Sequence, residues 1–152
     1  MCSSDLGAAL LAVVYYLNAE LFLVDPAVLD ISPVTAGLVS FVGLVLAWLS
    51  YELLCRSRLG ASDLTLAIAG YVFLVALAVA FTQTLSGRGA FTQIGAVIGT
   101  MMVANVFVVI IPNQRKTVAA LRAGATPDPA LGRQAGQRSL HNNYLKIGRA
   151  HV

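Results

Sequence analysis

Residues 101–145 decide the fold of this chain: MMVANVFVVIIPNQRKTVAALRAGATPDPALGRQAGQRSLHNNYL. Up to Ile111 nearly every side chain is apolar, and Pro112 is then followed by the polar run NQRK at residues 113–116. Proline lacks a backbone N–H, and hydrocarbon offers polar groups no partner, so a helix is expected to leave the bilayer here. The stretch predicts a membrane-spanning helix that ends at a polar boundary.

The composition points to a membrane protein along its whole length. Hydrophobic residues make up 58% and charged residues 11% of the chain, whereas soluble domains carry about 25% charged residues. Four apolar stretches approach the roughly 20 residues that cross about 30 Å of hydrocarbon. We therefore expect an all-α, polytopic transmembrane bundle with about four spanning helices, followed by a cytoplasmic amphipathic segment and the start of a further helix. The four stretches are residues 7–24, 34–55, 64–84 and 90–111.

Basic residues are distributed unequally between the two predicted sides. The loops of one side hold only Arg88, beside Asp25 and Asp30. Cytoplasmic loops are enriched in Lys and Arg, so we predict that residues 113–140 are cytoplasmic and that the chain lies in the bacterial inner membrane. The basic residues of the other side are Arg56, Arg58, Arg115, Lys116, Arg122, Arg133 and Arg138.

Local signals predict the ends of the segments beyond the fourth stretch. Asn113 is expected to cap a short helix that ends at Gly124. Asp128 is expected to cap a second helix that has Pro129 at its first position.

Polar and aromatic residues near the predicted boundary suggest specific contacts. Trp48 and Tyr51 suit an interfacial aromatic belt, and Glu52 with Arg56 has the i,i+4 spacing of a helical ion pair. Asn105 is a polar residue within the fourth stretch, where such side chains usually bond a neighbouring helix.

The two ends are interpreted as translated adapter. Residues 1–6 (MCSSDL) and 146–152 (KIGRAHV) can be encoded by DNA strings that are reverse complements over their shared length and match a sequencing-library adapter. The alternative is that they are natural tails. Removing both ends lowers the formal charge from +3 to +2 and leaves Cys55 and His141 as the single cysteine and histidine, with no Cys-x-x-Cys-His motif.

Several uncommon segments give residues 7–145 a family resemblance. In order, they resemble the membrane-embedded N-terminal domain of bacterial urate oxidases (urate hydroxylases) that end in a cytochrome c domain. The segments are YYLNAELFLVDPAVLDIS (15–32), SYELLCRSRLG (50–60), IPNQRK (111–116), TPDPALG (126–132) and QRSLHNNYL (137–145).

The resemblance implies a reaction and partners. Such an enzyme oxidises urate toward 5-hydroxyisourate and passes electrons to haem c in its cytochrome c domain, or to another respiratory electron acceptor. That domain would lie outside this fragment, so the fragment alone is expected to be inactive. The family also implies a further spanning helix from about Leu140, with residues 141–144 on its first turns.

Candidate site residues follow from the chemistry of urate. Urate is a planar anion, and its recognition calls for a cation and amides that donate and accept in one plane. We expect Gln114, Arg115, Asn142 and Asn143 to bind substrate and His141 to accept a proton as the catalytic residue. Membrane anchoring, helix capping and a structural histidine are the alternative readings of these positions. We predict no metal site and no nucleic-acid binding.

A second class of function stays open from the sequence. Four or five spanning helices with one interfacial histidine also suit a non-enzymatic membrane subunit that carries haem for electron transfer, or that serves assembly or transport. A quinone or haem protein would be expected to place histidines within its helices, and residues 34–111 contain none.

Overall fold

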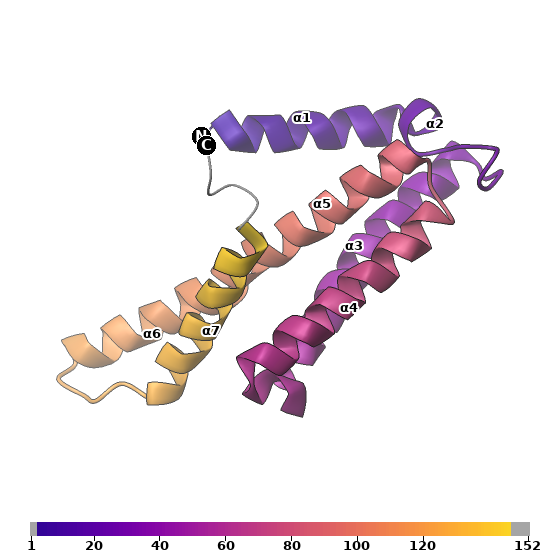
Figure 1. Ribbon diagram of the computed structural model, residues 1–152. Helices are drawn as coiled ribbons and strands as arrows, with labels where there is room; N and C mark the ends of the chain where they lie inside the picture. The colour runs from indigo at the N-terminus through magenta and orange to yellow at the C-terminus, as the bar shows by residue number, and fades with distance from the viewer. Residues whose placement is uncertain (1–2, 147–152) are drawn as a thin grey trace.

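A computed structural model describes residues 3–146, which are helical apart from turns and short connections (Figure 1). This confirms the all-α class. The adapter interpretation stays a prediction, and residues 1–2 and 147–152 on which it partly falls lie outside the described residues. The elements are α1 (Ser3–Leu17), α2 (Ala19–Phe22), α3 (Pro33–Arg56), the 3₁₀ turn η1 (Arg58–Ala61), α4 (Asp63–Thr82), α5 (Gly87–Ala104), the π-helical η2 (Asn105–Ile110), α6 (Ile111–Arg122) and α7 (Pro129–Lys146).

Three helices in the described part of the chain are long and apolar enough to cross a membrane: Pro33–Arg56, Asp63–Thr82 and Gly87–Arg122. They correspond to the second, third and fourth predicted stretches, and the exact number of spans stays a prediction. The first predicted span breaks at Asn18, and α1, with 15 residues, extends about 22 Å at 1.5 Å per residue, short of the hydrocarbon thickness. Figure 1 shows α1 at an angle to α3, α4 and α5, across one end of their bundle.

The helix that begins with α5 does not end at Pro112, contrary to the sequence prediction. It continues through η2 and α6 to Arg122. In a regular helix the proline ring would clash with the carbonyl four residues earlier, that of Val108. The wider π-helical turn directly before Pro112 shifts the hydrogen-bonding register, and the N–H of Ile111 bonds to the Val106 carbonyl instead.

Asn113 consequently lies inside a helix and does not cap one. Its amide Nδ2 donates to Gln134 Oε1 at 3.1 Å and to the Leu131 carbonyl at 3.4 Å, both on α7. The residue therefore ties α6 to α7.

The ends of α6 and α7 follow the sequence signals, but the further helix does not. Gly124 adopts φ +70° just beyond α6, and the N–H of Ala130 donates to Asp128 Oδ1 at 2.8 Å. No new helix starts at Leu140, because α7 runs unbroken from Pro129 to Lys146. Helix α7 folds back along η2 and α6 (Figure 1). Residues 141–144 lie in its last turns, because it ends at Lys146.

One narrow face of α3 forms the centre of the bundle. Ala36, Ser40, Ala47 and Tyr51 are buried there, and the small side chains let α5 approach closely. Gln93 of α5 donates from Nε2 to the Ser40 carbonyl at 2.6 Å. The apolar residues on the outer faces of α3 and α4 remain exposed, as lipid-facing side chains are.

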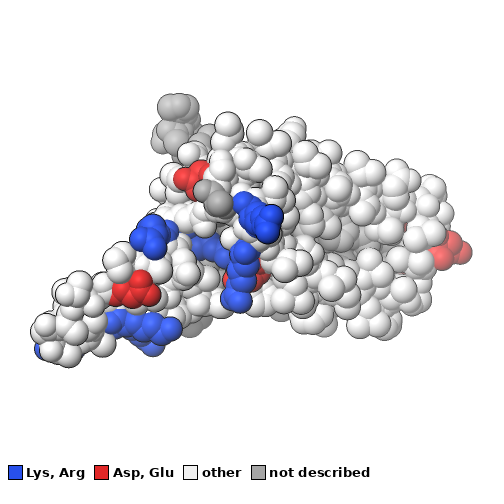
Figure 2. Space-filling model, turned by 90° about the horizontal axis from the view of Figure 1, so that it is seen from below, with Lys and Arg blue, Asp and Glu red and all other residues white. Residues whose placement is uncertain are grey.

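Basic side chains gather toward one end of the bundle. Figure 2 shows Lys and Arg gathered toward the end where α6 and α7 lie, with acidic residues alone at the opposite extreme of this face. This agrees with the unequal distribution of basic loops, although the direction in which the chain faces the cytoplasm stays a prediction.

Candidate polar network and pockets

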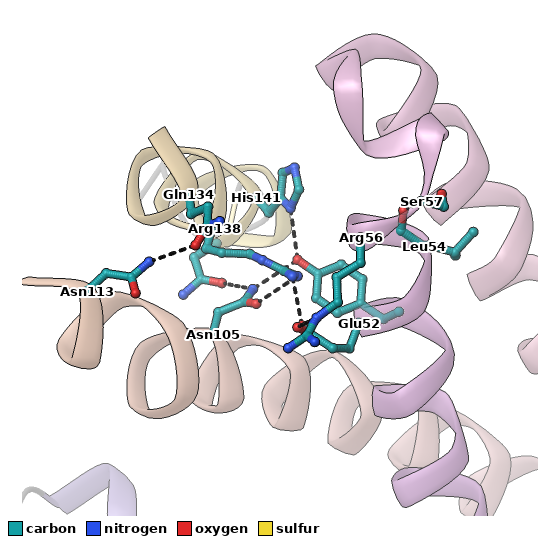
Figure 3. Close-up of polar contacts among 11 residues, drawn as sticks. Glu52, Leu54, Arg56, Ser57, Asn105, Asn113, Gln134, Arg138 and His141 are labelled. Atoms are coloured by element: carbon teal, nitrogen blue, oxygen red, sulfur yellow. Dashed lines mark hydrogen bonds and ion pairs between the residues drawn. The ribbon is translucent and has the colours of Figure 1, made fainter. Parts of the chain in front are cut away.

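Six side chains from three elements meet where α7 crosses the bundle (Figure 3). The last turns of α3 supply two of them, the first residue of η2 supplies one, and α7 supplies three at i, i+3 and i+4, which share one helix face. All but the glutamate are at most 9% exposed. They are Tyr51, Glu52, Asn105, Arg138, His141 and Asn142.

Arg138 is the cation at the centre of the network. It was expected in a cytoplasmic loop, but it is 5% exposed and its Nη2 donates to Glu52 Oε2 at 2.7 Å. Glu52 also accepts from Arg56 Nε at 2.7 Å, which confirms the predicted i,i+4 pair. The Arg138 guanidinium lies over the Tyr51 ring, 5.2 Å from its centre. Two arginines against one carboxylate leave this group with a net charge of +1.

The donors and acceptors of the network fix one another's orientation. Arg138 can only donate, so the Asn105 atom at 3.4 Å from its Nη1 is the amide oxygen. Asn105 Nδ2 then donates to the Tyr51 hydroxyl at 3.0 Å and to Asn142 Oδ1 at 2.9 Å. Asn142 Nδ2 donates onward to the Met102 carbonyl at 3.1 Å. Each amide therefore has a defined orientation.

His141 joins the network through Nδ1. The Tyr51 hydroxyl accepts from Asn105 and lies 2.8 Å from His141 Nδ1, in a hydrogen bond whose direction depends on the tautomer of the ring. The other ring nitrogen, Nε2, is buried and has no hydrogen-bond partner within the described chain. Burial lowers the pKa of His141 and the positive charge of Arg138 lowers it further, against a smaller opposing effect of Asp63. The ring is therefore neutral at pH 7.

A polar pocket of about 570 Å³ opens on the Arg138 side of the network. Its walls combine two arginines, one carboxylate and three side-chain amides, which gives it both a net positive charge and groups that donate and accept. The lining residues are Glu52, Cys55, Arg56, Val108, Val109, Asn113, Gln134, Gln137 and Arg138.

The predicted site residues fall into two groups. His141 and Asn142 meet in the buried network, whereas Asn143 is exposed on α7. Gln114 and Arg115 lie on the exposed side of α6, where they line a separate hollow together with Val118 and Arg122, among others. The structure does not bring these two residues to the network.

Four members of the network were not among the candidates drawn from the sequence. Tyr51 was expected in an aromatic belt but is buried, while Asn105 does bond neighbouring helices, as predicted. The i, i+3, i+4 spacing of Arg138, His141 and Asn142 could have indicated that these three side chains share one helix face. Glu52 and Arg138 are 86 positions apart, so nothing local could have paired them.

The comparisons with known proteins agree with the segments that carry the resemblance. No curated protein and no solved structure matches the chain. The model of the family described as "Urate oxidase N-terminal" matches residues 5–148, nearly the full length. The chain belongs to the urate oxidase N-terminal family.

Proposed function

We propose that this chain provides the urate-binding part of a membrane urate oxidase and that the polar pocket beside Arg138 holds the purine. The observation that carries the proposal is the pocket's chemistry: a buried, oriented arginine beside three amides in a site with a net charge of +1. Urate is an anion whose ring edge alternates carbonyl and N–H groups, so a charge-assisted contact and in-plane amide contacts would bind and orient it.

Proton transfer is the chemical task left to the side chains of this chain. Counted from the neutral purine, adding water and forming 5-hydroxyisourate releases two protons and two electrons. Glu52 is the carboxylate that lines the pocket and can accept a proton from the attacking water. Neither His141 nor Tyr51 lines the pocket, so in our proposal the second proton leaves to water at the opening of the pocket. His141 then acts indirectly, by holding the Tyr51 hydroxyl that accepts from Asn105.

In our proposal the electron acceptor would be haem c of a cytochrome c domain. Haem c would supply one-electron acceptance when present. The residues of this chain do not fit that group, because its two cysteines, Cys2 and Cys55, form no Cys-x-x-Cys-His motif. We also propose that the polar pocket faces the cytoplasm across the inner membrane, since Arg56 and Arg138 of its lining belong to the basic side predicted from the sequence.

The test measures urate binding by the full chain in lipid nanodiscs and urate oxidation by a longer homologue with the same segment. We expect Arg138→Gln to weaken urate binding by about 10- to 100-fold, because it removes a charge-assisted contact. Oxidation should fall about 100-fold in His141→Ala and Asn142→Ala. Arg133→Ala, on the exposed side of α7, is the matched control and should leave both unchanged.

The alternative site on α6 enters the same test. Arg115→Ala should have little effect if urate occupies the polar pocket, because Arg115 lines the separate hollow. Weaker urate binding in Arg115→Ala than in Arg138→Gln, with both proteins folded, would move the substrate to the surface of α6 and refute the pocket assignment.

A further inference from the structure

The face of α6 that is turned away from α7 carries a hollow of its own. Asn113 bonds α7, and Arg122 follows it by about two and a half turns at 3.6 residues per turn, so Arg122 lies on the opposite face. The hollow on that face has a volume of about 380 Å³. We call it the α6 hollow, and it is lined by Ile111, Gln114, Arg115, Val118, Ala119 and Arg122. All but Ile111 are exposed, so no described part of the chain covers this face.

The α6 hollow is positively charged. Arg115 and Arg122 line it, and no carboxylate is among the described side chains of its wall. Neither arginine forms an ion pair with a residue that the structure describes. In the polar pocket, by contrast, Glu52 accepts from both arginines. A guanidinium can donate two parallel N–H groups to a phosphate, so the α6 hollow suits a phosphate group.

The position of the hollow along its helix indicates where the phosphate comes from. The helix Gly87–Arg122 has 36 residues and is about 54 Å long at 1.5 Å per residue, against about 30 Å of hydrocarbon. Its polar end, α6, therefore extends beyond the hydrocarbon. Helical side chains lean toward the N-terminal end of their helix, which for α6 is the membrane end. Long arginine side chains on α6 thus reach back toward the lipid headgroups.

Apolar side chains accompany the two arginines and lead toward the hydrocarbon. Ile111 lies at the membrane end of the α6 hollow, and Val118, between the arginines in sequence, is 46% exposed. Phe107, on the π-helical turn before α6, is 66% exposed. Basic and apolar side chains on one helix face are typical of a helix that lies against a membrane interface. A ligand with both a phosphate and a hydrocarbon chain would contact both kinds of side chain.

We propose that the α6 hollow binds the headgroup of an anionic phospholipid, with the phosphate at Arg115 and Arg122 and an acyl chain beside Ile111. Charge complementarity and continuity with a spanning helix favour a lipid over a soluble anion, which would leave the apolar end of the hollow unused. The bound lipid holds α6 at the membrane surface. It leaves the polar pocket open, because the two sites share no lining residue.

Two pairs of variants separate this site from the general charge of the chain. Arg115→Gln with Arg122→Gln removes both cations of the α6 hollow. Arg58→Gln with Arg133→Gln is the matched control, because it removes the same charge from two exposed arginines outside the hollow. As a second variant of the site, Ala119→Glu places a carboxylate in the hollow and keeps both arginines.

Native mass spectrometry of the full chain in detergent micelles measures the affinity for the first bound lipid. The probes are dioleoyl phosphatidylglycerol and dioleoyl phosphatidylcholine, which have the same acyl chains and differ in headgroup charge. Each basic residue near an anionic headgroup strengthens binding about fivefold. We therefore expect the wild type and the control to prefer phosphatidylglycerol by at least about fivefold, and the two variants of the α6 hollow to lose that preference. Circular dichroism verifies that the variants are folded.

Equal affinities of the wild type for the two lipids would overturn the proposal. An equal loss of preference in both double variants would also overturn it, because the attraction would then belong to the basic side of the chain as a whole. Glycerol phosphate, the headgroup without acyl chains, should not displace phosphatidylglycerol. If it does, the α6 hollow takes a soluble anion and the lipid assignment fails.

Discussion

Replacing Arg138 by methionine tests whether the buried ion pair organises the site. Met has a similar length and no charge, so the change removes the partner of Glu52 and the donor to Asn105 Oδ1. Removing one member of a buried pair costs about 3–5 kcal/mol. Glu52 is 15% exposed and keeps Arg56, so we expect the low end, about 3 kcal/mol of unfolding free energy.

The assay is unfolding in mixed micelles with increasing SDS, followed by the fluorescence of Trp48, which lies one turn before Glu52 on α3. Arg56 is 73% exposed at its side chain, so Arg56→Met should cost less than about 1 kcal/mol. The double variant Glu52→Leu with Arg138→Met should recover most of the loss, because it removes both charges together. If Arg138→Met loses no more stability than Arg56→Met, the network does not hold α7 against α3.

Two further predictions concern protonation and sidedness. Burial and the charge of Arg138 lower the pKa of His141 in the folded protein below its ordinary value of 6.5. As the pH falls, the unfolded chain therefore takes up the proton before the folded chain does. The free energy of unfolding should decrease as the pH drops below about 6.5 and should level off below the folded-state pKa. The slope, at most about 1.4 kcal/mol per pH unit, should be absent in His141→Gln; an unchanged slope would assign it to another group. A reporter fused after Arg122 should report the cytoplasm and one inserted beside Asp30 the periplasm, and the reverse pattern would overturn the predicted orientation.

The recognition of the fold class required no tertiary information. Long apolar stretches leave a chain in lipid with few ways to satisfy its backbone, so the helices over residues 34–55 and 64–84 were predicted within two residues at either end. The helix ends near Gly124 and Asp128 were equally readable, because the glycine at positive φ and the capping carboxylate act within one turn.

Continuity through Pro112 could not be read from the sequence. Proline normally ends or kinks a helix, and only the π-helical turn of residues 105–110 allows the chain to continue. That turn also places Asn105 where α7 can reach it. The predicted helix end at Pro112 was wrong because the shifted hydrogen-bonding register of this turn accommodates the proline.

By itself, the sequence determined that this protein is a helical membrane protein with an uneven charge distribution, and its ordered segments identified the family. Hydropathy, charge distribution and short sequence segments each depend only on residues that are close together in the chain. The tertiary structure alone decided that Arg138 pairs with Glu52 and that His141 bonds Tyr51 across 90 positions. It also decided that the polar pocket lies beside that network, because such contacts depend on how α7 folds back over the bundle.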